Sequence, residues 1–172
     1  YRHAMTPPEM PSRLLVVGSG AIGIEFASFY NDMGAEVTVI EMVDRVVPAE
    51  DADVSAFLEK ALKKQGIQIM TSAALEEMTV RENEVAARIR TADGSVITEA
   101  FSHVIAAIGI VPNVEDIGLD ELGIARDARA HIRTDGLGRT NVSGVWAIGD
   151  CVAGPWLAHK ASHEGVTAAE AI

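Results

Sequence analysis

One stretch decides the fold of this chain: LLVVGSGAIGIE, from Leu14 to Glu25. It begins as an apolar run typical of a parallel strand that is buried on both faces. It then passes through the pattern G-x-G-x-x-G into a helical pattern. A bare G-x-G-x-x-G is often only a flexible loop, and its meaning depends on a strand before it and a helix after it. Both are predicted here, so the stretch indicates a dinucleotide-binding turn.

The three glycines have separate physical roles in such a turn. Gly18 permits the tight bend, Gly20 lets the backbone approach a pyrophosphate, and Gly23 lets the helix pack closely on the strand. The N-terminus of the helix supplies free N–H donors and about half a unit of positive charge to the phosphates. We therefore expect the cofactor-binding residues of this turn to be Gly18, Ser19, Gly20, Ala21, Ile22 and Gly23.

An acidic residue follows the second predicted strand. Glu41 follows the glycines by about 20 residues, the position where a carboxylate accepts hydrogen bonds from the adenine ribose hydroxyls. A 2′-phosphate there would meet a like charge, and at 4 Å the repulsion is about 4 kcal/mol for an effective dielectric of 20. This favours NAD over NADP. The alternative is a solvated acid at a strand end, and Arg45 complicates the assignment because a nearby arginine is how NADP sites hold that phosphate.

The segments around the turn alternate between strands and helices. We expect parallel strands at 13–17, 36–40 and 67–70, with a first helix that ends at Gly34 and a second at 53–64. In the first helix, an apolar stripe of Ile22, Phe26, Phe29 and Met33 is expected to face the sheet.

Hairpin patterns follow these alternating segments. The runs 75–80, 85–91 and 95–101 are separated by hairpin-turn residues and predict a small antiparallel meander. A buried strand at 103–107, an irregular region at 114–139, a short strand at 145–148 and a helix at 160–172 complete the prediction. The fold class is therefore α/β: a Rossmann-like NAD-binding domain with a parallel sheet and a three-stranded antiparallel meander as its crossover.

Composition excludes several functions. The chain has 172 residues and a formal charge of −11, which opposes binding to the phosphate backbone of nucleic acids. No apolar run approaches the ~20 residues of a membrane span. The single cysteine, Cys151, suits a reducing compartment and is expected to be a half-buried thiol rather than a nucleophile. The scattered histidines have no metal-ligand spacing. We therefore expect no nucleic acid, membrane or metal partner.

Three further motifs accompany the glycine turn. They are AAIGIVPN at 106–113, TNVSGVWAIGD at 140–150 and LAHKA at 157–161. In this order and spacing the sequence resembles the pyridine nucleotide-disulfide oxidoreductases, and within them the members that oxidise protein-bound dihydrolipoamide. The resemblance implies an NAD domain inserted into an FAD domain. It assigns 1–11 to a linker, 12–139 to the NAD-binding domain and 140–172 to the first part of the returning FAD domain.

The resemblance also implies roles for individual residues. Leu75 would touch the adenine through its backbone, and Glu25 and Gly109 would lie near the nicotinamide. Asp150 would bind the ribityl hydroxyls of FAD. The flavin ring would face the N-terminus of a helix that opens with Leu157, Ala158 and His159.

The chain departs from the family pattern at its reactive groups. It lacks the FAD glycine fingerprint, the C-x-x-x-x-C redox pair and the terminal His–Glu acid–base pair of that family. His159 and Glu164 have a similar offset, but they lie within the LAHKA region and lack the proline that follows the family's histidine. We therefore assign no catalytic residue, and expect the chain alone to bind NAD(H) without dihydrolipoamide turnover.

The parent enzyme implied by the resemblance uses FAD and a redox disulfide to pass electrons from dihydrolipoamide to NAD⁺. It would be a homodimer serving a 2-oxo-acid dehydrogenase complex with lipoyl domains, in the bacterial cytoplasm rather than the mitochondrial matrix. Two alternatives remain open: another flavin disulfide reductase or NADH oxidase, and a non-catalytic NAD(H)-binding module. An open reading frame that ends near Ile172 would favour the module.

Overall fold

The computed structural model describes residues 2–172, which form two compact units. The first unit ends at Ile108, and the second comprises Gly109–Ile172. The predicted limits at residues 12 and 140 rest on the resemblance to a family and stay a prediction. Within the described residues, no helix is long and apolar enough to cross a membrane.

The first unit is built on a four-stranded parallel sheet with the strand order β3-β2-β1-β7. The strands are β1 (Arg13–Val17), β2 (Glu36–Ile40), β3 (Gln68–Met70) and β7 (His103–Ala106). Val16 lies opposite Val39 on one side and Ile105 on the other. The three predicted strands before the meander are confirmed. The predicted return strand is also present, but it is only half-buried because β7 forms an edge of the sheet.

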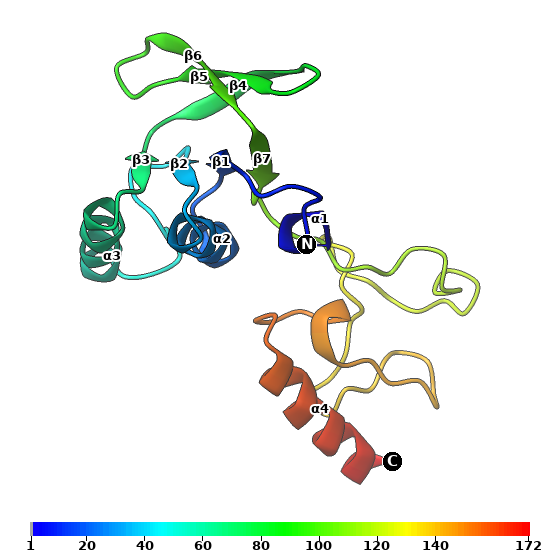
Figure 1. Ribbon diagram of the computed structural model, residues 1–172. Coiled ribbons are helices and arrows are strands. Elements are labelled where there is room, and N and C mark those ends of the chain that lie inside the picture. Colours follow the sequence, from blue (N-terminus) through cyan, green and yellow to red (C-terminus); the bar gives the residue numbers. More distant parts are fainter. Residues whose placement is uncertain (1) are drawn as a thin grey trace. The chain divides into compact units, whose positions relative to one another are not determined.

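The two faces of the sheet carry different layers (Figure 1). Helices α2 (Ala21–Asp32) and α3 (Ala52–Lys64) cover one face. The antiparallel meander of β4 (Ala74–Val80), β5 (Val85–Arg90) and β6 (Val96–Phe101) stands at the other. Successive side chains of a strand point to opposite faces, so Leu14 and Val16 join the core under the helices, while Leu15 joins the core under the meander. The predicted meander crossover is confirmed.

The face of α2 that meets the sheet differs from the prediction. Its buried residues are Gly23, Ile24, Ala27 and Tyr30, whereas Ile22, Phe29 and Met33 are 44%, 52% and 59% exposed. Only Phe26 of the expected stripe packs against the core. The contact face is centred on Gly23 and Ala27, because small residues let the helix approach the strand closely. Ile24 and Tyr30 lie on this face, and Ile22, Phe29 and Met33 do not.

The segment before β1 contains an unpredicted short helix, α1 (Arg2–Met5). The Tyr30 hydroxyl of α2 donates a hydrogen bond to the Ala4 carbonyl. Residues 6–12 then run without helix or strand, as their three prolines require.

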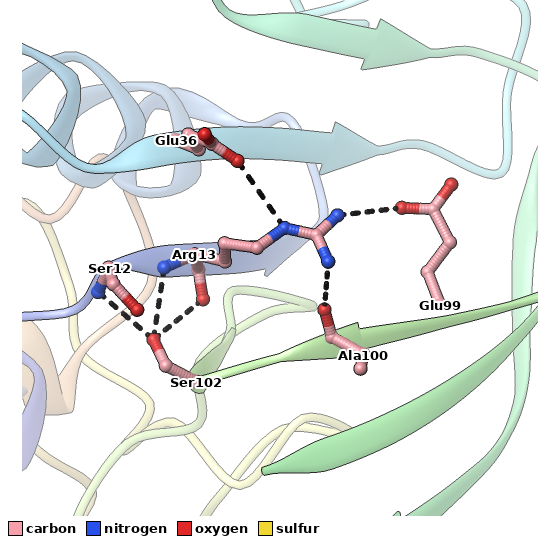
Figure 2. A network of polar contacts seen from close by, with 6 residues as sticks. All are labelled: Ser12, Arg13, Glu36, Glu99, Ala100 and Ser102. Atoms are coloured by element: carbon pink, nitrogen blue, oxygen red, sulfur yellow. Dashed lines mark hydrogen bonds and ion pairs between the residues drawn. The ribbon is translucent and has the colours of Figure 1, made fainter.

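A polar network joins the start of the sheet to the meander (Figure 2). The Arg13 guanidinium contacts Glu36 at 3.4 Å and Glu99 at 3.3 Å, and it donates to the Ala100 carbonyl at 2.6 Å. The Ser102 hydroxyl accepts from the Ser12 and Arg13 amides, each at 3.1 Å. The network therefore holds β6 and the start of β7 against the amino end of β1, at the opposite end of this strand from the glycine turn.

The second unit has little regular structure. It contains the 3-10 turn η1 (Gly149–Cys151), helix α4 (Ala158–Ala171) and three isolated bridges. The predicted strand at 145–148 is absent: only Trp146 makes a bridge, to Arg139. The predicted C-terminal helix is present and begins at Ala158. A core of its own holds the unit together, consisting of Val114, Leu119, Ile124, Ile132 and Val152.

Candidate functional site

The glycine turn follows β1 directly and is held by backbone contacts on two sides. The Gly18 amide donates to the Ile40 carbonyl at 2.9 Å, which ties the turn to the end of β2. Gly18 has a φ of +99°, and a Cβ at this position would lie 2.5 Å from the carbonyl oxygen of Ala107. Both the backbone conformation and the lack of space therefore require glycine at the bend.

The other two glycines face different surroundings. A Cβ at Gly23 would overlap the carbonyl of Gly18 and lie 3.3 Å from the Cβ of Ala107. A Cβ at Gly20 would have nothing within 4 Å. Gly20 also has an ordinary extended backbone, with φ −63° and ψ 175°. Packing within the protein thus explains why residues 18 and 23 are glycines, while the space beside Gly20 is open to a ligand.

The first turn of α2 provides hydrogen-bond donors at this open space. Gly20 is the N-cap of the helix, and no side chain caps it. The first N–H groups of a helix lack partners inside the helix, which leaves the amides of Ala21, Ile22 and Gly23 available to an anion. This donor set fits a diphosphate.

Ser19 makes contacts that the sequence did not indicate. Its side chain is fully buried, and both its amide and its hydroxyl donate to Oε2 of Glu41, each at 2.8 Å. Its carbonyl accepts from the Val47 amide at 2.9 Å. The donors of Ser19 are therefore directed at Glu41, whereas the prediction placed Ser19 among the residues that touch the cofactor.

Glu41 lies half-buried at the end of β2, beside the glycine turn. Its Oε1 accepts from the Val43 amide at 3.1 Å. Burial raises the pKa of Glu41, but the donors from Ser19, Val43 and Met42 lower it by more, so the net pKa lies below the ordinary value. The carboxylate is therefore charged and held, and a carboxylate with about four acceptor positions retains capacity for a ribose hydroxyl.

The loop after Glu41 is anchored from two sides. The Val47 amide donates to the Ser19 carbonyl, and the buried Ser55 hydroxyl of α3 donates to the Val47 carbonyl at 3.4 Å. Arg45 donates to the Pro48 carbonyl of its own loop at 3.3 Å.

The remaining predicted NAD residues are spread over both units. Leu75 lies in β4, paired with Ile89, and packs against the core under the meander. Glu25 is exposed on α2. Gly109 is the first residue of the second unit.

The predicted FAD residues lie in the second unit around η1. Asp150 is exposed in η1, and its carboxylate has no hydrogen-bond partner among residues 2–172. Leu157 is the N-cap of α4, and Ala158 and His159 open the helix with exposed side chains. Cys151 is half-buried, and its thiol donates to the Ile148 carbonyl at 3.1 Å.

A clamp that sequence reasoning missed holds the turn before Asp150. Oε2 of Glu164 accepts from the Gly149 amide at 2.7 Å, while Nζ of Lys160 donates to the Gly149 carbonyl at 3.3 Å. The two side chains also pair with each other at 2.9 Å. Their four-residue spacing on a helix indicates an ion pair, but no sequence signal shows that the pair grips Gly149. Glu164 thus has a positioning contact, and no hydrogen bond or ion pair joins it to His159 among the described residues.

A metal centre has no counterpart in the described residues: in 2–172 no three His, Cys, Asp or Glu side chains are grouped to hold an ion.

Comparison with known proteins shows to which family the chain belongs. The family model described as pyridine nucleotide-disulphide oxidoreductase matches residues 2–165. The dihydrolipoyl dehydrogenase of Zymomonas mobilis is 60% identical over 172 residues, which is 100% of this chain and 37% of that protein. That of Rhizobium etli is 45% identical over 100% of this chain and 36% of its own length. The chain therefore spans a little more than a third of these relatives.

Solved structures agree with the family and the fold. LpdA from Mycobacterium tuberculosis superposes with a TM-score of 0.80 at 34% identity, covering 93% of this chain and 34% of that one. The Cu(II) complex of RclA, a HOCl-induced flavoprotein disulfide reductase from Escherichia coli, gives a TM-score of 0.88 at 26% identity, covering 98% and 38%. The resemblance inferred from the motifs is confirmed.

Proposed function

Because this chain belongs to the pyridine nucleotide-disulphide oxidoreductase family, we propose that it is the NAD(H)-binding part of a flavin-dependent dihydrolipoamide dehydrogenase. In the proposed parent reaction, dihydrolipoamide is oxidised to its cyclic disulfide, and NAD⁺ is reduced to NADH with release of a proton. The 60% identity to a dihydrolipoyl dehydrogenase supports this reaction over others in the family.

The observation that carries the proposal is the contrast among the three glycines. Gly18 and Gly23 have backbone atoms where a Cβ would lie, and Gly20 alone has open space. Gly20 is also the N-cap of α2, so this open space lies beside the unpaired amides of the first helical turn. It leaves room for a diphosphate to approach the backbone at these donors.

The residues have the following proposed roles. The amides at the start of α2 bind the diphosphate, with the helix N-terminus adding partial positive charge. Glu41 accepts hydrogen bonds from the adenosine ribose, and Leu75 lies at the adenine. Glu25 and Gly109 lie toward the nicotinamide. The nicotinamide and flavin rings supply the hydride transfer when they are bound, and the protein orients them.

The second unit is proposed to contribute part of an FAD site. Asp150 would accept hydrogen bonds from the ribityl chain. The contacts of Lys160 and Glu164 with Gly149 would hold Asp150 in position for this. Leu157, Ala158 and His159 would present the N-terminus of α4 to the flavin ring. The whole enzyme is proposed to be a homodimer that serves a lipoyl-bearing 2-oxo-acid dehydrogenase complex in the cytoplasm.

Calorimetric titration of the chain with NADH tests the proposal. The wild-type chain should bind NADH, and Gly20→Ala should fold normally but bind at least about tenfold more weakly, because its methyl group fills the approach to the diphosphate. Gly136→Ala is the matched control, since Gly136 also has open space at its Cβ and no positive φ. Unchanged affinity in Gly20→Ala, or no NADH binding by the wild type, would refute the proposed role.

A second parent function is favoured by the fold comparison. The TM-score of 0.88 to RclA supports another flavin disulfide reductase as the parent. Assay of the full-length gene product separates the two, because only a dihydrolipoamide dehydrogenase would reduce NAD⁺ with dihydrolipoamide as the donor. The chain alone should show no such turnover.

A further inference from the structure

Ser19 is one of three buried polar residues of the chain's described part, together with Thr38 and Ser55. It has no exposed surface, although it belongs to a turn that the proposed function places against a ligand. A buried hydroxyl and amide need acceptors, and both of these donors share one acceptor atom, Oε2 of Glu41.

We propose that Ser19 is a positioning residue for Glu41: it orients the carboxylate that distinguishes an adenosine ribose from a 2′-phosphorylated one. This inference rests on the proposed function, because it concerns how the same dinucleotide site chooses between NAD(H) and NADP(H). It assigns Ser19 to selectivity, through Glu41, rather than to contact with the cofactor.

The geometry restrains both oxygens of the carboxylate. Oε2 is fixed by two donors from Ser19, and Oε1 by the Val43 amide. Ser19 is itself restrained, because its carbonyl accepts from the Val47 amide. The carboxylate plane therefore has one preferred orientation before a ligand arrives, and such preorganisation reduces the entropic cost of binding.

The pKa of Glu41 depends on the same contacts. Burial raises the pKa of the Glu41 carboxyl, while the Ser19 amide, the Val43 amide, the Ser19 hydroxyl and the Met42 amide lower it. No charged side chain is among these causes. The ionisable neighbours in the loop are Asp44, Arg45 and Glu50, and the elements packed against Glu41, namely the glycine turn and residues 70–73, contribute none. Loss of the hydroxyl should therefore raise the pKa of Glu41.

The test compares Ser19→Ala with Ser55→Ala. Each variant loses a buried hydroxyl beside the loop that follows Glu41, but only Ser19 donates to the carboxylate. NADH and NADPH affinities are measured by calorimetry from pH 7 downward. Ser19→Ala should weaken NADH binding about fivefold at pH 7 and bring the dissociation constants of NADH and NADPH closer together. The pH at which NADH binding is half lost on acidification should be higher than in the wild type. Ser55→Ala should leave this midpoint where it is in the wild type.

A second measurement separates failure of this inference from failure of the proposed function. Carbon-detected NMR titration of the Glu41 carboxyl needs no ligand, and its pKa should be higher in Ser19→Ala than in the wild type or Ser55→Ala. An unchanged pKa, or a pH midpoint that moves equally in both variants, overturns the role of Ser19. Absence of NADH binding by the wild type overturns the proposed function and, with it, the selectivity role. Should Ser19→Ala fail to fold, Ser19→Cys fills the site with a slightly larger side chain that is a weaker donor, and it has the same expected shifts.

Discussion

A Cβ on residue 18 would lie 2.5 Å from the carbonyl oxygen of Ala107, so the glycine turn and the residue after β7 meet with no room for a side chain. The contact joins the end of the first strand to the end of the last. It places the N-terminus of α2 directly over the carboxyl edge of the sheet, where open α/β sheets bind their ligands.

Gly18→Ala should therefore destabilise the first unit strongly. The substitution combines a φ of +99° with overlap against a backbone oxygen that cannot move aside, and we expect a loss of about 3 kcal/mol in the free energy of unfolding. Urea denaturation followed by circular dichroism measures this loss. Gly20→Ala in the same turn is the control, with a change of less than about 1 kcal/mol. Equal losses in the two variants would contradict the packing argument.

Replacement of Glu41 by glutamine should reduce the discrimination between NADH and NADPH. The change removes a charge that would lie beside a 2′-phosphate, and the ratio of the two dissociation constants should fall at least about tenfold, even after allowance for solvent screening. Parallel calorimetric titrations at constant ionic strength give both constants. Wild-type binding of NADPH as tight as that of NADH, or an unaltered ratio in the variant, contradicts the assignment of Glu41.

Asp93 should titrate far below a normal aspartate. In the turn between β5 and β6, the Thr91 hydroxyl donates to its carboxylate at 2.6 Å and the Ser95 amide at 3.0 Å, which lowers the pKa of Asp93 from 3.8 to about 2. Because the folded pKa is depressed, the contribution of Asp93 to stability is complete above pH 3.8 and is lost as the pH falls through about 2. NMR titration measures the pKa, and Thr91→Val should raise it. A pKa near 3.8 in the wild type would show that these contacts do not persist.

Glu164→Ala should loosen the turn that carries Asp150. The Gly149 amide would lose its acceptor, and its hydrogen exchange should become about five- to tenfold faster, in line with a hydrogen bond worth about 1 kcal/mol. Exchange measured by NMR, residue by residue, tests this, with Glu170→Ala as the control because Glu170 is exposed near the end of the same helix. The same acceleration at Gly149 in both variants would mean that helix stability, and not the clamp, protects this amide.

The clamp that Lys160 and Glu164 form on Gly149 should weaken in acid, because it depends on the charge of Glu164. Burial raises the pKa of Glu164, but the Gly149 amide and Lys160 lower it by more, so the net pKa lies below 4.5. The clamp's contribution is therefore present above pH 4.5 and is lost as the pH falls through the lowered pKa. Gly149 exchange in the wild type, corrected for its intrinsic pH dependence, should approach that of Glu164→Ala in acid.

Local patterns were sufficient for most of the first unit. The alternation of apolar runs with glycine and hairpin turns predicted β1, β2, β3, the meander and both long helices, and the resemblance to a family was confirmed by the family model. Each of these signals depends on residues a few positions apart. The roles of Leu75, Asp150 and the other carried-over residues depend on ligands and stay predictions.

The sequence by itself determined the order of strands, turns and helices and the glycine at the bend, because these follow from backbone preferences of neighbouring residues. Only the tertiary structure decided which face of α2 is buried, that residues 145–148 pair through Trp146 alone, and that Ser19 donates to Glu41. Those outcomes depend on how closely a helix approaches a strand and on which acceptor a buried donor meets. The partners lie far apart in the chain, where no local pattern records them.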